Sequence, residues 1–268
     1  MSGIAALQMY DLPALRQATD ALWASIAAAL RARGQAAPER LMRGVDPSDV
    51  WRDPALLFAQ TCGYPYWNRL RGHVRLVATP VYSAPGCEGP RYRSAIIVRT
   101  DDPANGLSDC KGYRPAVNAL DSQSGHNALR AAVAPLARGA PFLGCGIETG
   151  AHLASADAVA GGAADIAAID CVTWALARRA APDAVAGLRR IAWSPAAPAL
   201  PFVTAAMRDD AGVAIIRDAL KAALAEENLA EARATLMLED VVVLCEDAYA
   251  TIPAMEVAAG AAGQPPLL

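Results

Sequence analysis

The stretch of sequence with the clearest chemical potential is Asn118–Asn127, which reads Asn-Ala-Leu-Asp-Ser-Gln-Ser-Gly-His-Asn. It follows a short apolar run typical of a strand, and it leads into residues 128–136, whose composition favours a helix. The first N–H groups of a helix lack partners within it, and the helix dipole adds partial positive charge there. Hydroxyl groups and glycine let an anion approach these donors closely, so the stretch could be a seat for an oxyanion.

The alternative interpretation is an ordinary helix cap, in which Asp121 or Ser122 accepts a hydrogen bond from the first N–H groups. The motif alone does not decide between a cap and an oxyanion seat. Both interpretations stay open on these residues.

Catalysis is not indicated by any motif. The sequence contains no nucleophile elbow, Walker A loop, metal-ligand spacing or dinucleotide fingerprint. Two nucleophile–base pairs can be named, Cys145 with His152 and Ser124 with His126, but nothing in their surroundings supports either pair. We therefore expect no enzyme, no cofactor and no bound metal.

Composition narrows the classes of partner. A chain of 268 residues can bury a sizeable core as one large domain or two smaller lobes. Its net charge of −3 argues against a nucleic-acid backbone as partner, which requires a basic face. No apolar run approaches the ~20 residues of a membrane helix. Residues 1–9 lack the charged and apolar regions of an export signal, so we expect them to form a first strand.

The six cysteines form no Cys-x-x-Cys pair, which leaves a zinc site or a thioredoxin-type site without support. Cys62 and Cys87 both lie in loops rich in Gly and Pro that follow expected strands. A disulfide between these loops is one prediction, and two free thiols are the other.

Strand-like and helix-like segments alternate along the chain, which predicts an α/β protein with mostly parallel sheets flanked by helices. The expected strands are 4–9, 56–60, 74–79, 93–99, 116–118, 142–147, 164–170 and 189–193. The expected helices are 11–33, 66–70, 128–136, 152–160, 171–179, 211–225 and 228–238.

Two breaks rich in turn residues, at 101–106 and at 194–201, bracket the central part of the chain. This pattern predicts a discontinuous first lobe of residues 1–100 plus 203–268 and a second lobe of residues 101–202. Two crossings between them would act as a hinge. Ligands of such proteins bind in a cleft outside the carboxyl ends of strands.

Five fragments occur in an order that resembles the phosphonate/phosphate-type substrate-binding proteins of ABC transporters, the PhnD-like group. The fragments are Thr61–Pro65, Thr79–Tyr82, Gly86–Ser94, Asn118–Asn127 and Ala163–Asp170. The resemblance spans roughly residues 4–260. It implies a type 2 periplasmic-binding fold with two α/β lobes that close on a small anionic ligand, and an ABC transporter permease as partner.

The resemblance and the positions of strand ends together give a set of expected ligand-binding residues. The anion-binding segment of the family matches Asp121, Ser122, Ser124 and Gly125, with Asn127 nearby, and a family histidine matches His152. The family's aromatic wall matches Tyr64, Tyr82 and Tyr92. Tyr10, Thr61 and Asp170 lie at strand ends, where side chains face such a cleft, although Asp170 could equally cap the next helix.

We therefore predict a solute-binding protein that captures a phosphonate, phosphate or related oxyanion for ABC-type uptake. The family implies the periplasm, whereas the expected lack of an export signal would suit the cytoplasm. The sequence also lacks a second acidic residue beside Asp170, which an aminophosphonate ligand would need. A cytoplasmic ligand sensor or accessory protein on the same fold is the alternative function, and an enzyme acting on a phosphorylated small molecule is a third.

Overall fold

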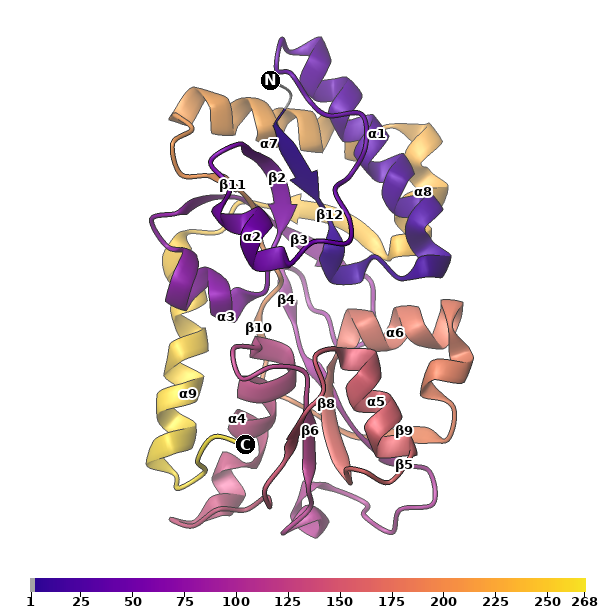
Figure 1. Ribbon diagram of the computed structural model, residues 1–268, viewed down its shortest axis with the longest axis vertical. Helices are drawn as coiled ribbons and strands as arrows, with labels where there is room; N and C mark the ends of the chain where they lie inside the picture. The colour runs from indigo at the N-terminus through magenta and orange to yellow at the C-terminus, as the bar shows by residue number, and fades with distance from the viewer. Residues whose placement is uncertain (1–2) are drawn as a thin grey trace. The chain divides into compact units, whose positions relative to one another are not determined.

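A computed structural model describes residues 3–268 and divides the chain into two compact α/β units (Figure 1). The first unit contains the chain up to Ser83, Glu88–Pro90 and Pro198–Ala248. The second contains Ala84–Cys87, Arg91–Ala197 and Tyr249–Leu268.

The first unit is built on a five-stranded sheet in the order β1-β2-β11-β3-β12. Its strands are β1 (Ile4–Ala6), β2 (Leu56–Gln60), β11 (Phe202–Ala205), β3 (Val74–Tyr82) and β12 (Leu238–Val242). Its helical segments are η1 (Gln8–Tyr10), η2 (Pro13–Leu15), α1 (Arg16–Ala32), α2 (Pro47–Arg52), α3 (Gly63–Pro65), η3 (Tyr66–Leu70), α7 (Asp210–Leu224), η7 (Glu227–Leu229) and α8 (Ala230–Leu236).

Helix α1 covers this sheet because its apolar residues recur at helical spacing. Leu22, Ile26 and Leu30 are buried, and the helix packs against α7 and α8. The Trp23 ring of α1 stacks on Phe58 of β2 with a centroid distance of 6.1 Å, and Phe58 stacks on Phe202 at 5.0 Å. These stacked rings fix the helix to the two central strands.

The second unit has a five-stranded sheet in the order β7-β6-β8-β5-β9. Its strands are β7 (Ile147–Glu148), β6 (Pro115–Val117), β8 (Ile166–Asp170), β5 (Ser94–Arg99) and β9 (Leu188–Trp193). Its helical segments are η4 (Leu107–Cys110), η5 (Gln123–Asn127), α4 (Ala128–Ala137), α5 (His152–Ala160), α6 (Cys171–Ala180), η6 (Pro182–Val185) and α9 (Thr251–Ala261). The short strands β4 (Arg91–Tyr92) and β10 (Ala197–Pro198) pair separately, and η8 (Glu246–Ala250) precedes α9.

Both faces of this second sheet are buried. On β5, Ile96 and Val98 belong to a core that includes Leu129 and Val133 of α4. The alternate residues of β5, with Val159 of α5 among their neighbours, form the core on the other face. The continuous apolar composition of β5 and β8 follows from this double burial.

The sheets are mixed rather than mostly parallel. Strands β1 and β2 pair in parallel, as do β6 with β7 and β6 with β8, whereas β11 is antiparallel to β2 and β3, and β5 is antiparallel to β8 and β9. Strands β5 and β11 each come soon after the chain has passed from one unit to the other. No helical crossover ties their direction to that of their neighbours.

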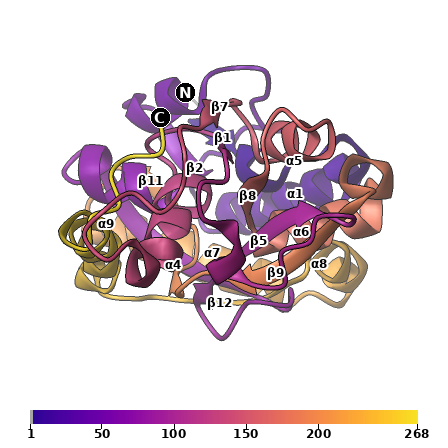
Figure 2. The same cartoon turned by 90° about the horizontal axis from the view of Figure 1, so that it is seen from below.

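The unit boundaries also differ from the expected ones. Strand β5 pairs with β8 and β9 in the second unit, and the tail 249–268 belongs to the second unit as well. The chain therefore passes between the units in three regions rather than two: between residues 83 and 91, where it changes unit three times, at 197–198 and at 248–249. Figures 1 and 2 both draw α9 alongside α4, and contacts between these helices hold the tail in place.

Other expected elements lie close to their expected positions, with two exceptions. The expected strand 4–9 ends at Ala6, and Gln8–Tyr10 form the short helix η1. The expected strand 142–147 is confined to β7, Ile147–Glu148. Phe142 and Leu143 are instead buried in a turn, where their backbone N–H groups donate to the side-chain oxygen of Gln264. Within residues 3–268, no helix is long and apolar enough to cross a membrane.

Candidate anion-binding site

The candidate site in the second unit lies where β6 ends and the η5–α4 helical run begins. The Ser122 side chain caps this run, because its Oγ accepts a hydrogen bond from the Gly125 N–H at 3.0 Å. The backbone carbonyl of Ser122 accepts from the Asn127 N–H at 3.0 Å. The cap and the oxyanion seat are therefore compatible, because the Ser122 oxygen accepts in the cap while the hydroxyl of Ser124 is a further donor beside it.

Ser124 is held by a side chain from another helix. Its Oγ lies 2.7 Å from Nε2 of His152, the first residue of α5. Its backbone carbonyl accepts from the Ser94 hydroxyl of β5 at 2.8 Å. Ser124 is thus fixed on its backbone and on its side chain beside the first N–H groups of the helical run.

His152 is uncharged at neutral pH. Burial lowers its pKa to about 4, and the backbone of Ala168 only partly opposes this effect. A neutral imidazole has one N–H donor and one acceptor nitrogen, so its tautomer decides whether Ser124 donates or accepts in the 2.7 Å contact.

Gly125 is required by the close approach of Asn118. A Cβ added at Gly125 would lie 1.8 Å from Oδ1 of Asn118, a distance that no side chain can accept. Asn118 is the residue directly after β6, so its amide packs against the start of η5. Glycine is the residue that leaves room for this packing.

The side chain of Asn127 holds neighbouring segments of the second unit together. It is fully buried, and its Nδ2 donates to Oε1 of Gln123 at 2.7 Å and to the carbonyl of Ile252 at 2.9 Å. These bonds tie η5 to α9, which makes Asn127 a poor ligand donor. Asp121 lies half-buried just before the capping serine.

Asp170 caps the next helix, as the alternative interpretation held. It is the last residue of β8, 1% exposed, and its Oδ1 accepts from the N–H groups of Val172 and Thr173 at 2.8 and 3.1 Å. These bonds define the start of α6. Tyr92 lies in β4 and is buried.

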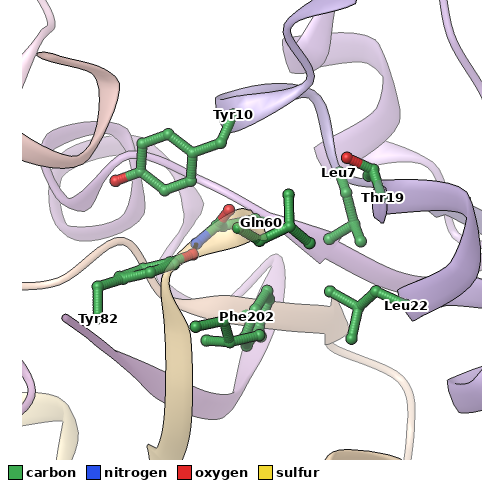
Figure 3. A pocket seen from close by; sticks show the side chains of 9 residues that line it. Leu7, Tyr10, Thr19, Leu22, Gln60, Tyr82 and Phe202 are labelled. Carbon is green, nitrogen blue, oxygen red and sulfur yellow. Dashed lines mark hydrogen bonds between the residues drawn. The ribbon is translucent and has the colours of Figure 1, made fainter. Parts of the chain in front are cut away.

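The other expected residues belong to the first unit, where two of them line one small cavity of about 30 Å³ (Figure 3). The rings of Tyr10 and Tyr82 meet edge to face with centroids 5.3 Å apart, and Nε2 of Gln60 donates to the Tyr82 hydroxyl at 3.1 Å. The N–H of buried Thr61 donates to Pro201 at 3.0 Å, and Tyr64 is half-buried in α3.

Sequence reasoning assigned no role to two residues that position the seat in the second unit. Ser94 fixes the backbone of Ser124, and Asn118 packs on Gly125. Ser94 comes from a strand 30 positions away, so no local spacing marks it. His126 is buried and accepts a hydrogen bond from the Leu267 N–H at 3.3 Å, because the C-terminal tail covers it.

The cysteines and the proposed nucleophile–base pairs have other partners. Cys62 and Cys87 are not joined by a disulfide, and Cys87 lies against Cys171 instead. The exposed Cys145 contacts a backbone carbonyl, and His152 faces Ser124. Among residues 3–268, no group of three or more His, Cys, Asp or Glu residues has the arrangement of a metal site.

Two α/β units of this topology define a type 2 periplasmic-binding-protein fold. The family model for the periplasmic substrate-binding proteins of ABC phosphonate transporters matches residues 56–242, more than half of the chain. The chain belongs to this family. A search of curated proteins found no match.

Solved structures of low sequence identity share the fold. The binding-protein component of an ABC phosphonate transporter from Pseudomonas aeruginosa is 16% identical, with a TM-score of 0.77 over 97% of this chain and 88% of that one. PhnD1 from Prochlorococcus marinus, in complex with methylphosphonate, is 12% identical, with a TM-score of 0.74 over 96% and 97%. XAC2383 from Xanthomonas citri, bound to ATP, is 15% identical, with a TM-score of 0.71 over 98% of each chain.

Proposed function

We propose that this chain binds a small organophosphonate or related oxyanion at the start of the η5–α4 helical run and delivers it to the permease of an ABC transporter. The observation that carries the proposal is the 2.7 Å contact between the Ser124 hydroxyl and the neutral His152 ring, beside the N-terminus of that run. It places a hydroxyl donor and an adaptable imidazole beside the first residues of the helical run, where the helix dipole favours an anion.

The chemistry of the pair suits reversible capture. The Ser124 hydroxyl has one hydrogen to donate, so it can serve His152 or the anion but not both. When an oxyanion arrives, the hydroxyl turns toward it, and the imidazole donates to the Ser124 oxygen from its other tautomer or after taking up a proton. Neutral donors and helix N–H groups bind an anion without a covalent step, which agrees with capture and release.

The family supports the transport role, because its members are periplasmic substrate-binding proteins. PhnD1, a protein of the same fold, was solved with methylphosphonate, and we carry this ligand class over to the present chain as part of the proposal. Hinge closure of two lobes around the ligand remains a prediction. So does the role in shaping the site expected for five residues: Tyr10, Thr61, Tyr64, Tyr82 and Tyr92. A ligand sensor on the same fold would use the same seat.

A titration series tests the ligand class. The purified protein is titrated by calorimetry with methylphosphonate, phosphate, sulfate and acetate, and its thermal unfolding is followed with each. Methylphosphonate or phosphate at a hundred times its Kd should stabilise the fold by about 2.7 kcal/mol, which raises Tm by several degrees. No heat and no Tm shift with any of the four anions would overturn the proposal. Product analysis of the same samples tests for turnover, which the proposal excludes.

A further inference from the structure

We propose that Cys87 and Cys171 are a redox-active pair that forms an intramolecular disulfide by exchange with a low-molecular-weight disulfide such as glutathione disulfide. Both residues belong to the second unit, and their sulfur atoms lie 3.4 Å apart as free thiols. A disulfide requires the sulfurs to be about 2.0 Å apart, so bond formation needs an approach of only about 1.4 Å.

The backbone brings the two thiols together from distant parts of the chain. Cys87 ends a turn in which its N–H donates to the Ala84 carbonyl at 2.9 Å. Cys171 begins α6, and its N–H donates to the Arg93 carbonyl at 3.0 Å. Both cysteines are therefore held in place by their main chains.

Gly86 permits this approach. It has a φ of +105°, and a Cβ added there would lie 2.8 Å from the Trp193 ring and 2.9 Å from Cβ of Cys171. Any side chain at this position would push the turn away from α6 and separate the thiols. The glycine therefore serves the close packing of the turn on the pair.

The difference in exposure of the two thiols sets the order of the reaction. Cys87 is half-buried, whereas Cys171 is fully buried, and the contact with Cys87 together with burial raises the pKa of Cys171. Cys87 attacks one sulfur of glutathione disulfide and expels the first glutathione. Cys171 then attacks the Cys87 sulfur of this mixed disulfide and expels the second. Two protein thiols are oxidised, one glutathione disulfide is reduced, and the two thiol protons end on the two glutathiones.

The bond would connect positions 84 residues apart and would tie the turn 84–87, between β3 and β4, to the start of α6. Closing so long a loop restricts the unfolded chain, so oxidation should raise Tm by roughly 5–10 °C. The family to which the chain belongs is described as periplasmic, and the bacterial periplasm is a compartment where disulfides form.

Peptide mapping tests the pairing directly. Trypsin releases Cys87 in residues 76–91 and Cys171 in residues 139–178, and the second peptide also contains Cys145, so the experiment uses the Cys145→Ser protein. The folded protein is treated with glutathione disulfide, its remaining thiols are alkylated after unfolding, and the digest is analysed by mass spectrometry. We expect these two peptides to be linked, and reduction to separate them. Glutathione retained on Cys87, both thiols alkylated, or Cys87 linked to Cys62 would each overturn the proposal.

Two glycine variants test whether the rate of disulfide formation depends on the packing of the turn against Cys171 or only on the reactivity of the thiols. Gly86→Ala keeps both thiols but adds the methyl group that collides with Trp193 and Cys171, and it should slow disulfide formation about tenfold or more. Gly89→Ala is the matched control, because Gly89 also has a positive φ of +54° but has open space around it. It should form the bond at close to the original rate. Equal rates in the two variants, both folded by circular dichroism, would contradict the proposed geometry.

Discussion

The side chains of Ser124 and His152 meet at 2.7 Å although 28 positions separate them in the chain. The contact joins the first turn of η5 to the first residue of α5, so two helix starts share one polar pair. Because the pKa of His152 is lowered to about 4, the ring enters this pair uncharged at neutral pH. The pair can therefore redirect its hydrogen bond toward an arriving anion without breaking an ion pair first.

Ser124→Ala should weaken methylphosphonate binding by about 10- to 100-fold, because it removes one hydrogen bond to a charged group. Calorimetry of both proteins at the same pH and salt gives the ratio of Kd values. Ser108→Ala is the matched control, since Ser108 is exposed in η4 of the same unit and should leave Kd unchanged. Equal affinities of the wild type and Ser124→Ala would remove Ser124 from the seat.

Ser122→Ala should behave differently, because the Ser122 hydroxyl accepts from the Gly125 N–H. We expect a loss of unfolding free energy of about 1 kcal/mol from the lost cap. Chemical denaturation measures this loss, and calorimetry shows whether affinity changes with it. A large loss of affinity at unchanged stability would mean that the Ser122 hydroxyl contacts the anion directly.

The residues of the candidate seat could be found from the sequence to the extent that their roles are local. The order Ser-x-Ser-Gly before an apolar helical run predicts a helix start with a capping hydroxyl, and Ser122 has that role. The contact of Ser124 with His152, and the support from Ser94, depend on how three strands pair. Spacing along the chain gives no information about such contacts, so His152 and Ser94 can be identified as partners of Ser124 only from the three-dimensional structure.

Gly125→Ala should destabilise the second unit, because the new Cβ would lie 1.8 Å from the Asn118 side chain. We expect a loss of about 2–4 kcal/mol in unfolding free energy, as for other overpacked or strained sites. Adding Asn118→Ala should restore much of it, since the colliding amide is then gone. Gly106→Ala is the control, with open space at its Cβ position. Failure of the double variant to recover any stability would contradict the packing argument.

Asp170→Ala should cost about 1–2 kcal/mol of stability, because α6 loses a side chain that accepts from two N–H groups. Asp170→Asn keeps an acceptor oxygen and should retain most of that stability. Denaturation of both variants measures the cap, and titration with methylphosphonate separates it from a ligand role. If Asp170→Asn is stable yet fails to bind, Asp170 also contacts the ligand.

The layout of the fold was predictable where periodicity decides it, as for α1, β2 and α5, whose positions agree closely with the expected ones. Strand direction and unit boundaries could not be predicted in this way. They depend on contacts between distant parts of the chain, through which β5 and the tail 249–268 join the second unit. The tail is held by the Arg130 side chain, which donates to the carbonyls of Pro265 and Gln264. An arginine inside an apolar helical run gives no indication of such a partner.

The buried His126 should make stability depend on pH. Burial and the nearby Arg130 lower its pKa to about 4 from an ordinary value of 6.5, whereas Glu256 and the backbone of Leu120 act in the opposite direction. The folded state therefore favours the neutral ring, and the unfolded chain takes up a proton as pH falls below 6.5. This contribution to stability is complete above pH 6.5. It is lost progressively as the pH falls from 6.5 to 4, and the loss at pH 4.5 is about 2–3 kcal/mol.

His126→Gln tests this contribution, because glutamine can still accept from the Leu267 N–H but cannot be protonated there. Urea denaturation at pH 7.5 and pH 4.5 should give a smaller drop in unfolding free energy for the variant than for the wild type, by about 2 kcal/mol. His73→Gln is the control: His73 is exposed, so its replacement should leave the drop unchanged. Identical drops in the wild type and His126→Gln would show that the folded protein accommodates a charged ring at this position, against the burial argument.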